Sequence, residues 1–237
     1  MHLHVDMSVK LAELESFLNQ TAHPQTRLSV CVMLLTAQVL LMCQAIHDLK
    51  NARSQQARFV LLRSALEAVV RLIYVVEKGD VAGFALELDD NRQRWKHSTS
   101  ESRRQIGQDS EAKHAESQAT ARWLESQIPE SKKLAEKFSG VYKILDDIND
   151  SIAQDVKSRF NELYNFFSAV SHGQHSAMRL IHGHYLDIHL LKPTPFSFEN
   201  DIDGYVLEFI DLTQVAVKNY VLGSQSTTGV LAPKYPI

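Results

Sequence analysis

A long run of residues without a charged side chain constrains the fold more than any other feature of this sequence. It reads LSVCVMLLTAQVLLMCQAI from Leu28 to Ile46 and approaches the roughly 20 apolar residues that a membrane-spanning helix requires. The next apolar segment, FVLLRSALEAVVRLIYVV, carries Arg63, Glu67 and Arg71, and each of these charges would cost about 2–3 kcal/mol inside a bilayer. We therefore expect the uncharged run to be the central helix of a soluble bundle, with no part of the chain inserted in a membrane.

Charge and cysteine content favour a cytoplasmic protein. The formal net charge of −3 gives no global basic field, so a nucleic-acid partner would need a local basic cleft. Cys31 and Cys43 fall in one predicted helix, about 18 Å apart, which is beyond the reach of a disulfide. The first residues, MHLHVDMSVK, lack the apolar core and cleavage site of a secretory signal. We expect both cysteines to be reduced and buried in the cytoplasm.

The spacing of apolar residues predicts an all-α fold. Apolar side chains recur every three or four residues almost throughout, and no segment alternates as a strand would. A short polar link between the uncharged helix and the next helix predicts an antiparallel hairpin, and the KGD sequence around Gly79 predicts where that next helix ends. We predict one multi-helix bundle over 1–222 and a mobile tail at 223–237. The predicted helices cover about 7–19, 28–50, 57–77, a short segment from Pro129, 150–172 and 202–222.

Residues 81–127 differ in composition from the rest of the chain. They are charged, rich in Ser and Gln and poor in large aliphatic residues, which predicts a protruding polar helical arm or insertion with a break near Gly107. Because the charges are of both signs, a solvated helical face is expected. The other interpretation is a contact with a partner or with RNA through Arg92, Arg94, Lys96, Arg103 and Arg104.

Several common catalytic motifs are missing from the sequence. It has no GxxxxGK, GxGxxG or GxSxG pattern and no paired-cysteine motif, so neither a nucleotide cradle nor a serine-hydrolase elbow is supported. We expect no cofactor.

A group of histidines raises the question of a metal site. Three converging imidazoles with an open coordination position would suit zinc. However, the histidine spacing matches no established helical zinc motif and no cysteine joins the group. We therefore expect loop histidines exposed to solvent, and no metal, at His172, His175, His182, His184 and His189.

Two polar stripes on predicted helices are the candidate site. RSALEAVVR places Arg63, Glu67 and Arg71 four residues apart, so that neighbouring side chains meet along one helix face. YNFFSAVSHGQH does the same for a second set of polar residues, Tyr164, Ser168 and His172, with Asn165 beside them.

Packing of the two helices against each other would bring complementary chemistry together. Glu67 could orient or charge His172, and His172 could take a proton from a ribose 2′-hydroxyl. Arg63 and Arg71 could hold the phosphate that this hydroxyl attacks. These are the parts of a metal-independent ribonuclease, but a purely structural polar seam between two helices would give the same sequence pattern.

These residues resemble a known group of proteins. A helix with Arg63-x-x-x-Glu67, followed much later by a helix with Tyr164-x-x-x-Ser168-x-x-x-His172, is similar to uncharacterised helical bacterial proteins related to the HEPN superfamily. The resemblance extends over about residues 28–175.

The resemblance implies a helical bundle that often forms homodimers. In active members it implies a metal-independent endoribonuclease of toxin or phage-defence systems, with RNA and a protein partner such as an antitoxin as binding partners. His172, Arg63 and Glu67 would then be catalytic, and Arg71, Tyr164, Asn165 and Ser168 would bind the substrate. One departure from the family pattern is that Asn165 stands where the signature arginine before the histidine is expected, and an amide cannot neutralise a phosphate. A non-catalytic interaction module or small-anion-binding module remains the alternative.

Overall fold

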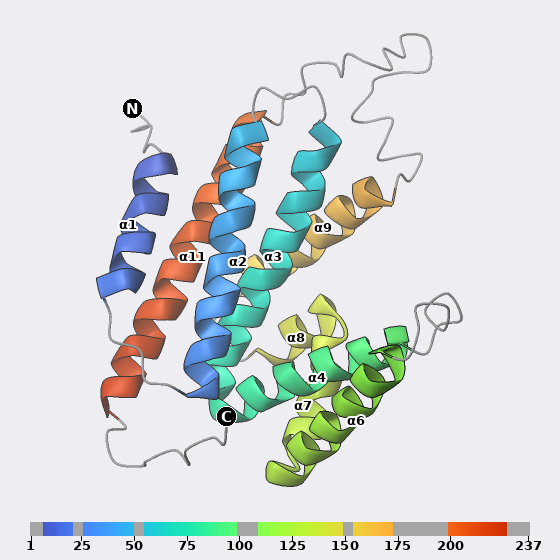
Figure 1. Ribbon diagram of the computed structural model, residues 1–237. Coiled ribbons are helices and arrows are strands. Elements are labelled where there is room, and N and C mark those ends of the chain that lie inside the picture. Colours follow the sequence, from blue (N-terminus) through green and yellow to red (C-terminus); the bar gives the residue numbers. More distant parts are fainter. Residues whose placement is uncertain are drawn as a thin grey trace.

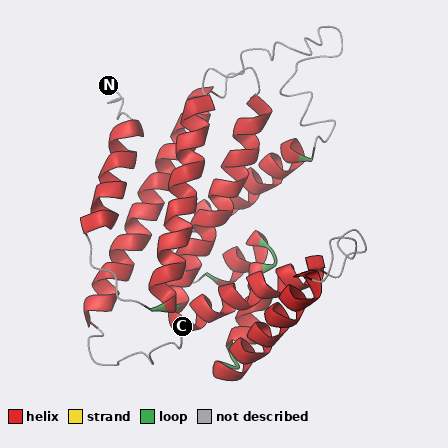
Figure 2. Cartoon of the chain, viewed as in Figure 1, coloured by secondary structure: helices red, strands yellow, loops and turns green. Residues whose placement is uncertain are grey.

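The computed structural model of the chain describes residues 7–20, 26–49, 55–98, 109–148, 154–172 and 199–226. Within these ranges the regular structure is helical and no strand is present (Figure 1, Figure 2). The predicted all-α multi-helix bundle is therefore confirmed. The helices are α1 (Met7–Gln20), α2 (Arg27–Asp48), α3 (Gln55–Lys78), α4 (Asp80–Ser98), α6 (Asp109–Gln127), α7 (Ser131–Phe138), α8 (Val141–Asp147), α9 (Gln154–Ser171) and α11 (Glu199–Ser226).

Long helices that pack side by side form the main part of the molecule (Figure 1). α2 and α3 make the expected antiparallel hairpin, α11 packs against both, and α1 packs against α11 and α2. α9 crosses α3 obliquely on the side away from α2 (Figure 1). Fully buried aliphatic and aromatic side chains fill the interior, among them Val39, Leu66, Phe167 and Phe209. In this core α3 packs against α2, α9 and α11. Polar residues of α3 and α9 lie where these two helices cross.

Local signals in the sequence place the ends of the central hairpin. Thr26 and Ser29 form a reciprocal capping box at the start of α2, in which each side chain accepts from the other residue's backbone N–H. α3 ends at Gly79, whose φ of 67° lies in the left-handed region and whose N–H donates to the Val75 carbonyl at 2.9 Å. The predicted glycine stop is therefore confirmed, and it turns the chain from α3 into α4.

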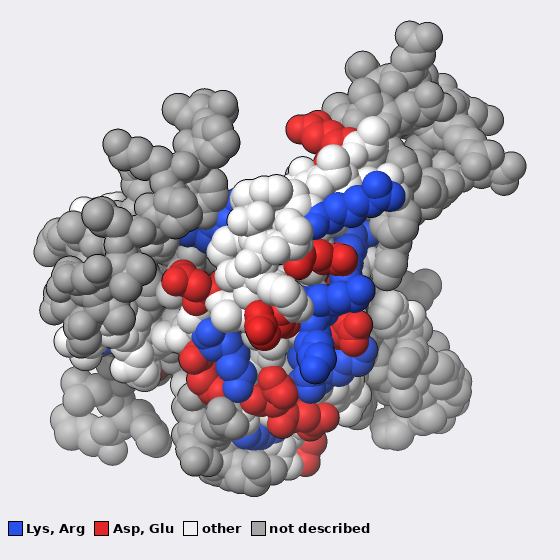
Figure 3. Space-filling view, turned by 90° about the horizontal axis from the view of Figure 1, so that it is seen from below, with Lys and Arg blue, Asp and Glu red and all other residues white. Residues whose placement is uncertain are grey.

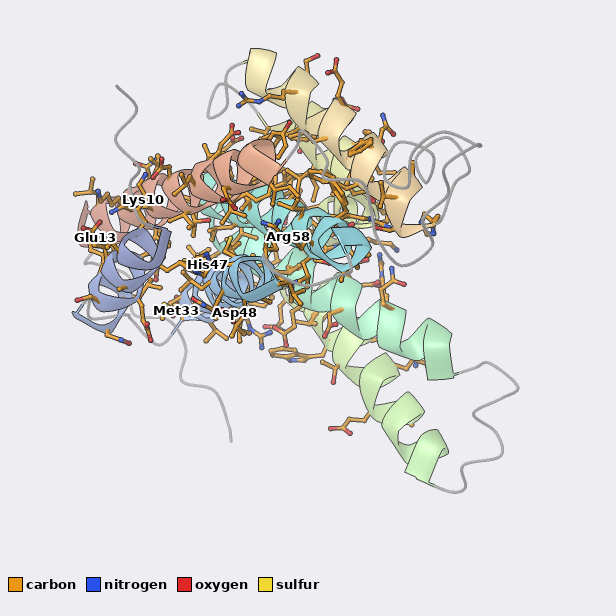
Figure 4. All side chains as sticks on the ribbon, turned by 90° about the horizontal axis from the view of Figure 1, so that it is seen from above. Lys10, Glu13, Met33, His47, Asp48 and Arg58 are labelled. Atoms are coloured by element: carbon orange, nitrogen blue, oxygen red, sulfur yellow. The ribbon has the colours of Figure 1, made fainter. Side chains whose placement is uncertain are left out.

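The segment predicted as a polar arm contains two helices. α4 and α6 pack against each other and extend away from the long helices when the molecule is seen from above (Figure 4). Ala85 and Leu88 on α4 and Leu124 on α6 are fully buried, and α4 also packs against α7. Arg92 pairs with Glu125 across the arm. Of the other basic residues considered for an RNA contact, Arg103 and Arg104 lie outside the described residues, as do the side chains of Arg94 and Lys96.

The arm is fastened to the bundle at the N-terminal end of α2. The Arg27 guanidinium carbon lies 4.6 Å from the ring centroid of Phe84 on α4 and 4.9 Å from that of Trp123 on α6. Arg27 also pairs with Glu87. At Gly83, a Cβ would lie 3.5 Å from the backbone of Leu28, an ordinary van der Waals contact, so α4 lies close to α2 here and leaves room for little more than a methyl group.

Two parts of the chain differ from expectation. α8 was not predicted, although its buried residues Val141, Ile144, Leu145 and Ile148 have helical spacing. α11 begins at Glu199 and continues to Ser226, four residues into the segment expected to be a mobile tail. The rest of that tail, 227–237, lies outside the described residues.

α2 is less enclosed than a central helix would be. By length and composition it is the one helix of the described ranges that could cross a membrane, yet only 39% of its most apolar 18-residue window is buried. The inner face packs against α3, α11 and α4. Val30, Leu34 and Leu41 on the outer face are 53%, 65% and 68% exposed.

Candidate functional site

The crossing of α3 and α9 brings the two predicted polar stripes together. The Arg63 guanidinium on α3 lies 3.3 Å from Nε2 of His172, the residue that follows α9, and donates a hydrogen bond of 3.3 Å to the hydroxyl of Tyr164. The Arg63 guanidinium carbon is also 5.3 Å from the centroid of the Tyr164 ring. Arg63 thus joins both ends of the α9 stripe.

Glu67 completes the seam from the same helix as Arg63. Its Oε1 accepts a hydrogen bond of 3.2 Å from Arg63 Nε, which is the geometry of an i,i+4 ion pair. Glu67 was expected to orient or charge His172. In the structure Arg63 is the group beside the imidazole. Both side chains are about one-quarter exposed, at 24% for Arg63 and 27% for Glu67, so the pair is open to a ligand from solvent.

Aromatic packing beneath the seam fixes how α9 lies on α3. The ring of Phe59 meets the ring of Phe166 edge-on with centroids 5.5 Å apart, and lies 6.1 Å from the ring of Phe167. Phe59 and Phe167 are both buried. Because aromatic pairs of this geometry stabilise a contact beyond the area that they bury, they hold Arg63 opposite Tyr164 and His172.

Tyr142 on α8 is a member of the site that the sequence interpretation missed. Its ring packs edge-on against Tyr164 with centroids 5.2 Å apart, and its hydroxyl donates to the side-chain oxygen of Asn165. Tyr142 is 38% exposed. The apolar spacing of α8 was the signal that could have located it. We call Arg63, Glu67, Tyr142, Tyr164, Asn165 and His172 the α3–α9 seam.

The charges of the seam keep Arg63 protonated. Partial burial alone would lower the pKa of Arg63, but the hydrogen bond and charge of Tyr164, together with those of Glu67, raise it above its usual value. Partial burial, with a smaller contribution from Tyr164, raises the pKa of Tyr142, and the charge of Arg63 opposes this shift. The seam therefore combines a permanent cation at Arg63 with a phenol at Tyr142 whose pKa is raised.

The Arg63 contact sets a requirement for the His172 ring. A guanidinium has only donors, so a hydrogen bond here requires Nε2 as its acceptor, with a ring proton on Nδ1. His172 is exposed, and its backbone N–H donates to the Ser168 carbonyl at 3.0 Å. A ligand that draws Arg63 away from Nε2 would leave a free basic nitrogen at the surface.

Arg71 and Ser168 stand apart from this cluster. Arg71 donates a hydrogen bond of 3.4 Å to the Phe138 carbonyl at the end of α7, where Lys143 also bonds to the Glu136 carbonyl and to Ser139. Two cations therefore satisfy carbonyl groups at a helix C-terminus. Arg71 was expected to bind the same anion as Arg63, but it packs against α7. Ser168 is half-buried within α9, and its backbone carbonyl supports His172.

Only one member of the histidine group, His172, lies in the described part of the chain. His175, His182, His184 and His189 lie outside the described residues. Among the residues that are described, no group of three or more His, Cys, Asp or Glu side chains could hold a metal ion.

Comparison with known proteins places the chain in a family. No curated protein and no solved structure matches it significantly. A family of unknown function, DUF5677, matches residues 28–187, which is more than half of the chain. The matched range contains every residue of the α3–α9 seam, from Arg63 to His172. The chain belongs to this family, DUF5677.

Proposed function

We propose that the α3–α9 seam binds RNA and cleaves it in the manner of HEPN-like ribonucleases, without a metal ion in the reaction. The observation that supports this proposal is the contact between Arg63 and His172 at 3.3 Å. It places a permanent cation beside an imidazole on an exposed part of the surface. A phosphodiester needs both groups, because one neutralises the phosphate and the other accepts the proton of the attacking hydroxyl.

The chemistry would begin when a phosphate replaces His172 as a partner of Arg63. The freed Nε2 takes the proton of the 2′-hydroxyl, and the 2′-oxygen forms a bond to phosphorus. The bond from phosphorus to the 5′-oxygen breaks, and that oxygen receives the proton from the imidazolium. The products are a 2′,3′-cyclic phosphate and a 5′-hydroxyl, and Arg63 stabilises the extra negative charge on phosphorus during the step.

The other seam residues would position the substrate. The Tyr164 hydroxyl accepts from Arg63, so its own proton remains available for a phosphate oxygen. The side-chain oxygen of Asn165 accepts from Tyr142, which directs the amide N–H groups of Asn165 to other acceptors. The exposed ring of Tyr142 offers a surface on which an unpaired base can stack.

The charge distribution favours a short, local contact with single-stranded RNA. On the face seen from below, Lys and Arg side chains are interleaved with Asp and Glu, so this face offers no uniformly basic path (Figure 3). The net charge of −3 agrees with this pattern. Affinity would therefore come from a few phosphates near Arg63, and a protein partner of the antitoxin type could block the same small area.

One observation favours a second candidate, a seam that binds a small anion or a partner without cleavage. Arg71 bonds to α7, so the seam has one arginine where two were expected, and Asn165 replaces a second charged group. A single guanidinium is sufficient to bind a phosphate but gives less stabilisation to a transition state with additional charge.

Incubation of purified protein with total RNA in EDTA separates these candidates. The proposed reaction predicts fragments that end in 2′,3′-cyclic phosphate, and it predicts that His172→Ala removes the activity. RNA in which the 2′-hydroxyl is replaced by hydrogen should be bound but not cleaved. If wild-type protein leaves RNA intact, the proposed cleavage is wrong, and only the second candidate, a seam that binds an anion or a partner without cleavage, still stands.

A further inference from the structure

The outer face of α2 carries a row of exposed side chains that the fold leaves uncovered. Val30, Leu34, Ala37, Leu41 and Gln44 are all exposed, and the three large aliphatic members are 53%, 65% and 68% exposed in chain order. We call these five residues the α2 stripe. Their spacing alternates between four and three residues, which is the pattern that a helix uses to pack along a second helix.

The part of α2 that carries the stripe has no charge. No Asp, Glu, Lys or Arg occurs from Leu28 to Ile46, and beyond this run the exposed Asp48 accepts a hydrogen bond of 2.8 Å from Gln44 at the end of the stripe. Other exposed aliphatic residues are isolated. On α11, Val215 is 55% exposed and Leu222 is 64% exposed, but the exposed residues Asp211 and Lys218 interrupt that face. Single exposed apolar residues are ordinary, whereas a continuous apolar face marks an interaction site.

We propose that the α2 stripe binds the α2 stripe of a second copy of this chain. In a two-fold symmetric dimer each surface meets its own copy, so a charge near the symmetry axis would meet the same charge. An uncharged face avoids this repulsion and is therefore complementary to itself. Ala37, at the middle of the stripe, is small enough to let the two helices approach closely, and the exposed Gln38 can hydrogen-bond across the contact to fix its register.

The proposed dimer is independent of the proposed RNA chemistry. The α3–α9 seam contains residues of α3, α8 and α9 and none of α2. Each dimer would carry two seams, and variants of the α2 stripe leave Arg63 and His172 unchanged. Failure of one proposal therefore leaves the other standing.

Sedimentation of the full chain over a range of protein concentrations tests the dimer. Wild-type protein should reach the mass of a dimer. The dissociation constant of the dimer should rise at least about 100-fold in each of two double variants, Leu34→Lys with Leu41→Lys and Leu34→Glu with Leu41→Glu. A mixture of the two double variants should recover dimers, because opposite charges then face each other. Val215→Lys is the matched control on α11, and it should behave as wild type.

Three results would overturn the proposal. The first is wild-type protein that remains monomeric at every concentration. This result overturns the dimer whether or not the monomer binds vesicles of phosphatidylcholine and phosphatidylglycerol. The second is a dimer that both double variants preserve. The third is a mixture of the variants that stays monomeric. Circular dichroism of each charged variant checks that α2 is still helical. The uncharged double variant Leu34→Gln with Leu41→Gln should also weaken the dimer while it keeps the helical signal.

Discussion

The guanidinium of Arg63 lies 3.3 Å from Nε2 of His172, although 109 positions separate these residues in the chain. Arg63 also bonds to Glu67 and Tyr164, so one side chain connects every charged or ionisable group of the α3–α9 seam except Tyr142. Glu67 and Tyr164 orient the guanidinium through two of its nitrogens, and the third nitrogen, Nη1, lies beside the imidazole. The behaviour of the seam should therefore depend mainly on the shape of this side chain.

Arg63→Lys should impair RNA binding while it preserves the fold. An ammonium group keeps the charge, but it cannot present the planar set of donors that now reaches Glu67, Tyr164 and His172. We expect RNA affinity to fall about 10-fold or more, and the free energy of unfolding to change by less than about 1 kcal/mol. Fluorescence anisotropy with a short labelled RNA measures the first, and chemical denaturation the second.

Arg159→Lys is the matched control for this variant. Arg159 lies on α9 and, like Arg63, pairs with a carboxylate, here Glu208, but at an exposed position outside the seam. It should bind RNA as wild type does. Equal losses in both variants would indicate that general positive charge, and not the seam, determines RNA affinity.

Tyr74→Phe should destabilise the protein at neutral pH and less so in acid. The buried Tyr74 hydroxyl donates a 2.6 Å hydrogen bond to Asp147 at the end of α8. This bond, together with Lys137, lowers the pKa of Asp147 below its usual value of 3.8. A lowered pKa means that the stabilisation is present above about pH 4 and is lost as the pH falls through the lower value of the folded state.

Chemical denaturation at pH 7 and pH 3 measures this effect. At pH 7 we expect Tyr74→Phe to lower the free energy of unfolding by about 1–2 kcal/mol, because a hydrogen bond to a charged group is lost. At pH 3 the difference from wild type should be smaller. A difference that stays constant or grows in acid would mean that the hydroxyl stabilises the fold by another route.

Much of the fold could be predicted because helical periodicity is a local property. The spacing of apolar residues located α2, α3, α9 and α11, and Gly79 located the end of α3 because its left-handed conformation is local too. α8 was missed because it is only two turns long, so its apolar residues form too short a series to stand out.

The candidate site could be predicted only in part, for a different reason. The i,i+4 spacing shows that Arg63, Glu67 and Arg71 share a face of α3, but it does not show which element covers each turn of that face. In the structure α9 meets the first turn at Arg63, whereas α7 meets Arg71 two turns later. Tyr142 enters from α8, and nothing in its local sequence indicates that it reaches Asn165.

Asp203→Ala should destabilise the bundle more than a surface ion pair would. Its partner Arg58 is fully buried between α3 and α11 (Figure 4), and their side chains meet at 3.2 Å. Removal of the carboxylate leaves a buried cation with less compensation, which should lower the free energy of unfolding by about 3 kcal/mol. Lys10→Ala removes the exposed pair with Asp211 and should cost less than about 1 kcal/mol. Equal effects in denaturation curves would contradict a structural role for Arg58.

Gly83 should tolerate one methyl group and no more. A Cβ there would lie 3.5 Å from the Leu28 backbone, an ordinary van der Waals contact, so Gly83→Ala should be neutral or should stabilise α4 by up to about 1 kcal/mol. Gly83→Leu must push α4 away from α2 and should cost about 1–3 kcal/mol. Gly204 on α11, where a Cβ would meet nothing within 4 Å, is the control that should accept leucine. If Gly83→Leu were as stable as wild type, the close approach of α4 to α2 would be wrong.

A double-mutant cycle on RNA cleavage in EDTA tests the Arg63–His172 unit most directly. It compares wild type, Arg63→Ala, His172→Ala and the double variant. We predict that each single variant loses about 100-fold or more in rate, and that the double variant is scarcely worse than the slower single variant, because the two groups act in one step. A wild-type protein that leaves RNA intact, or single losses that multiply fully in the double variant, would contradict the account.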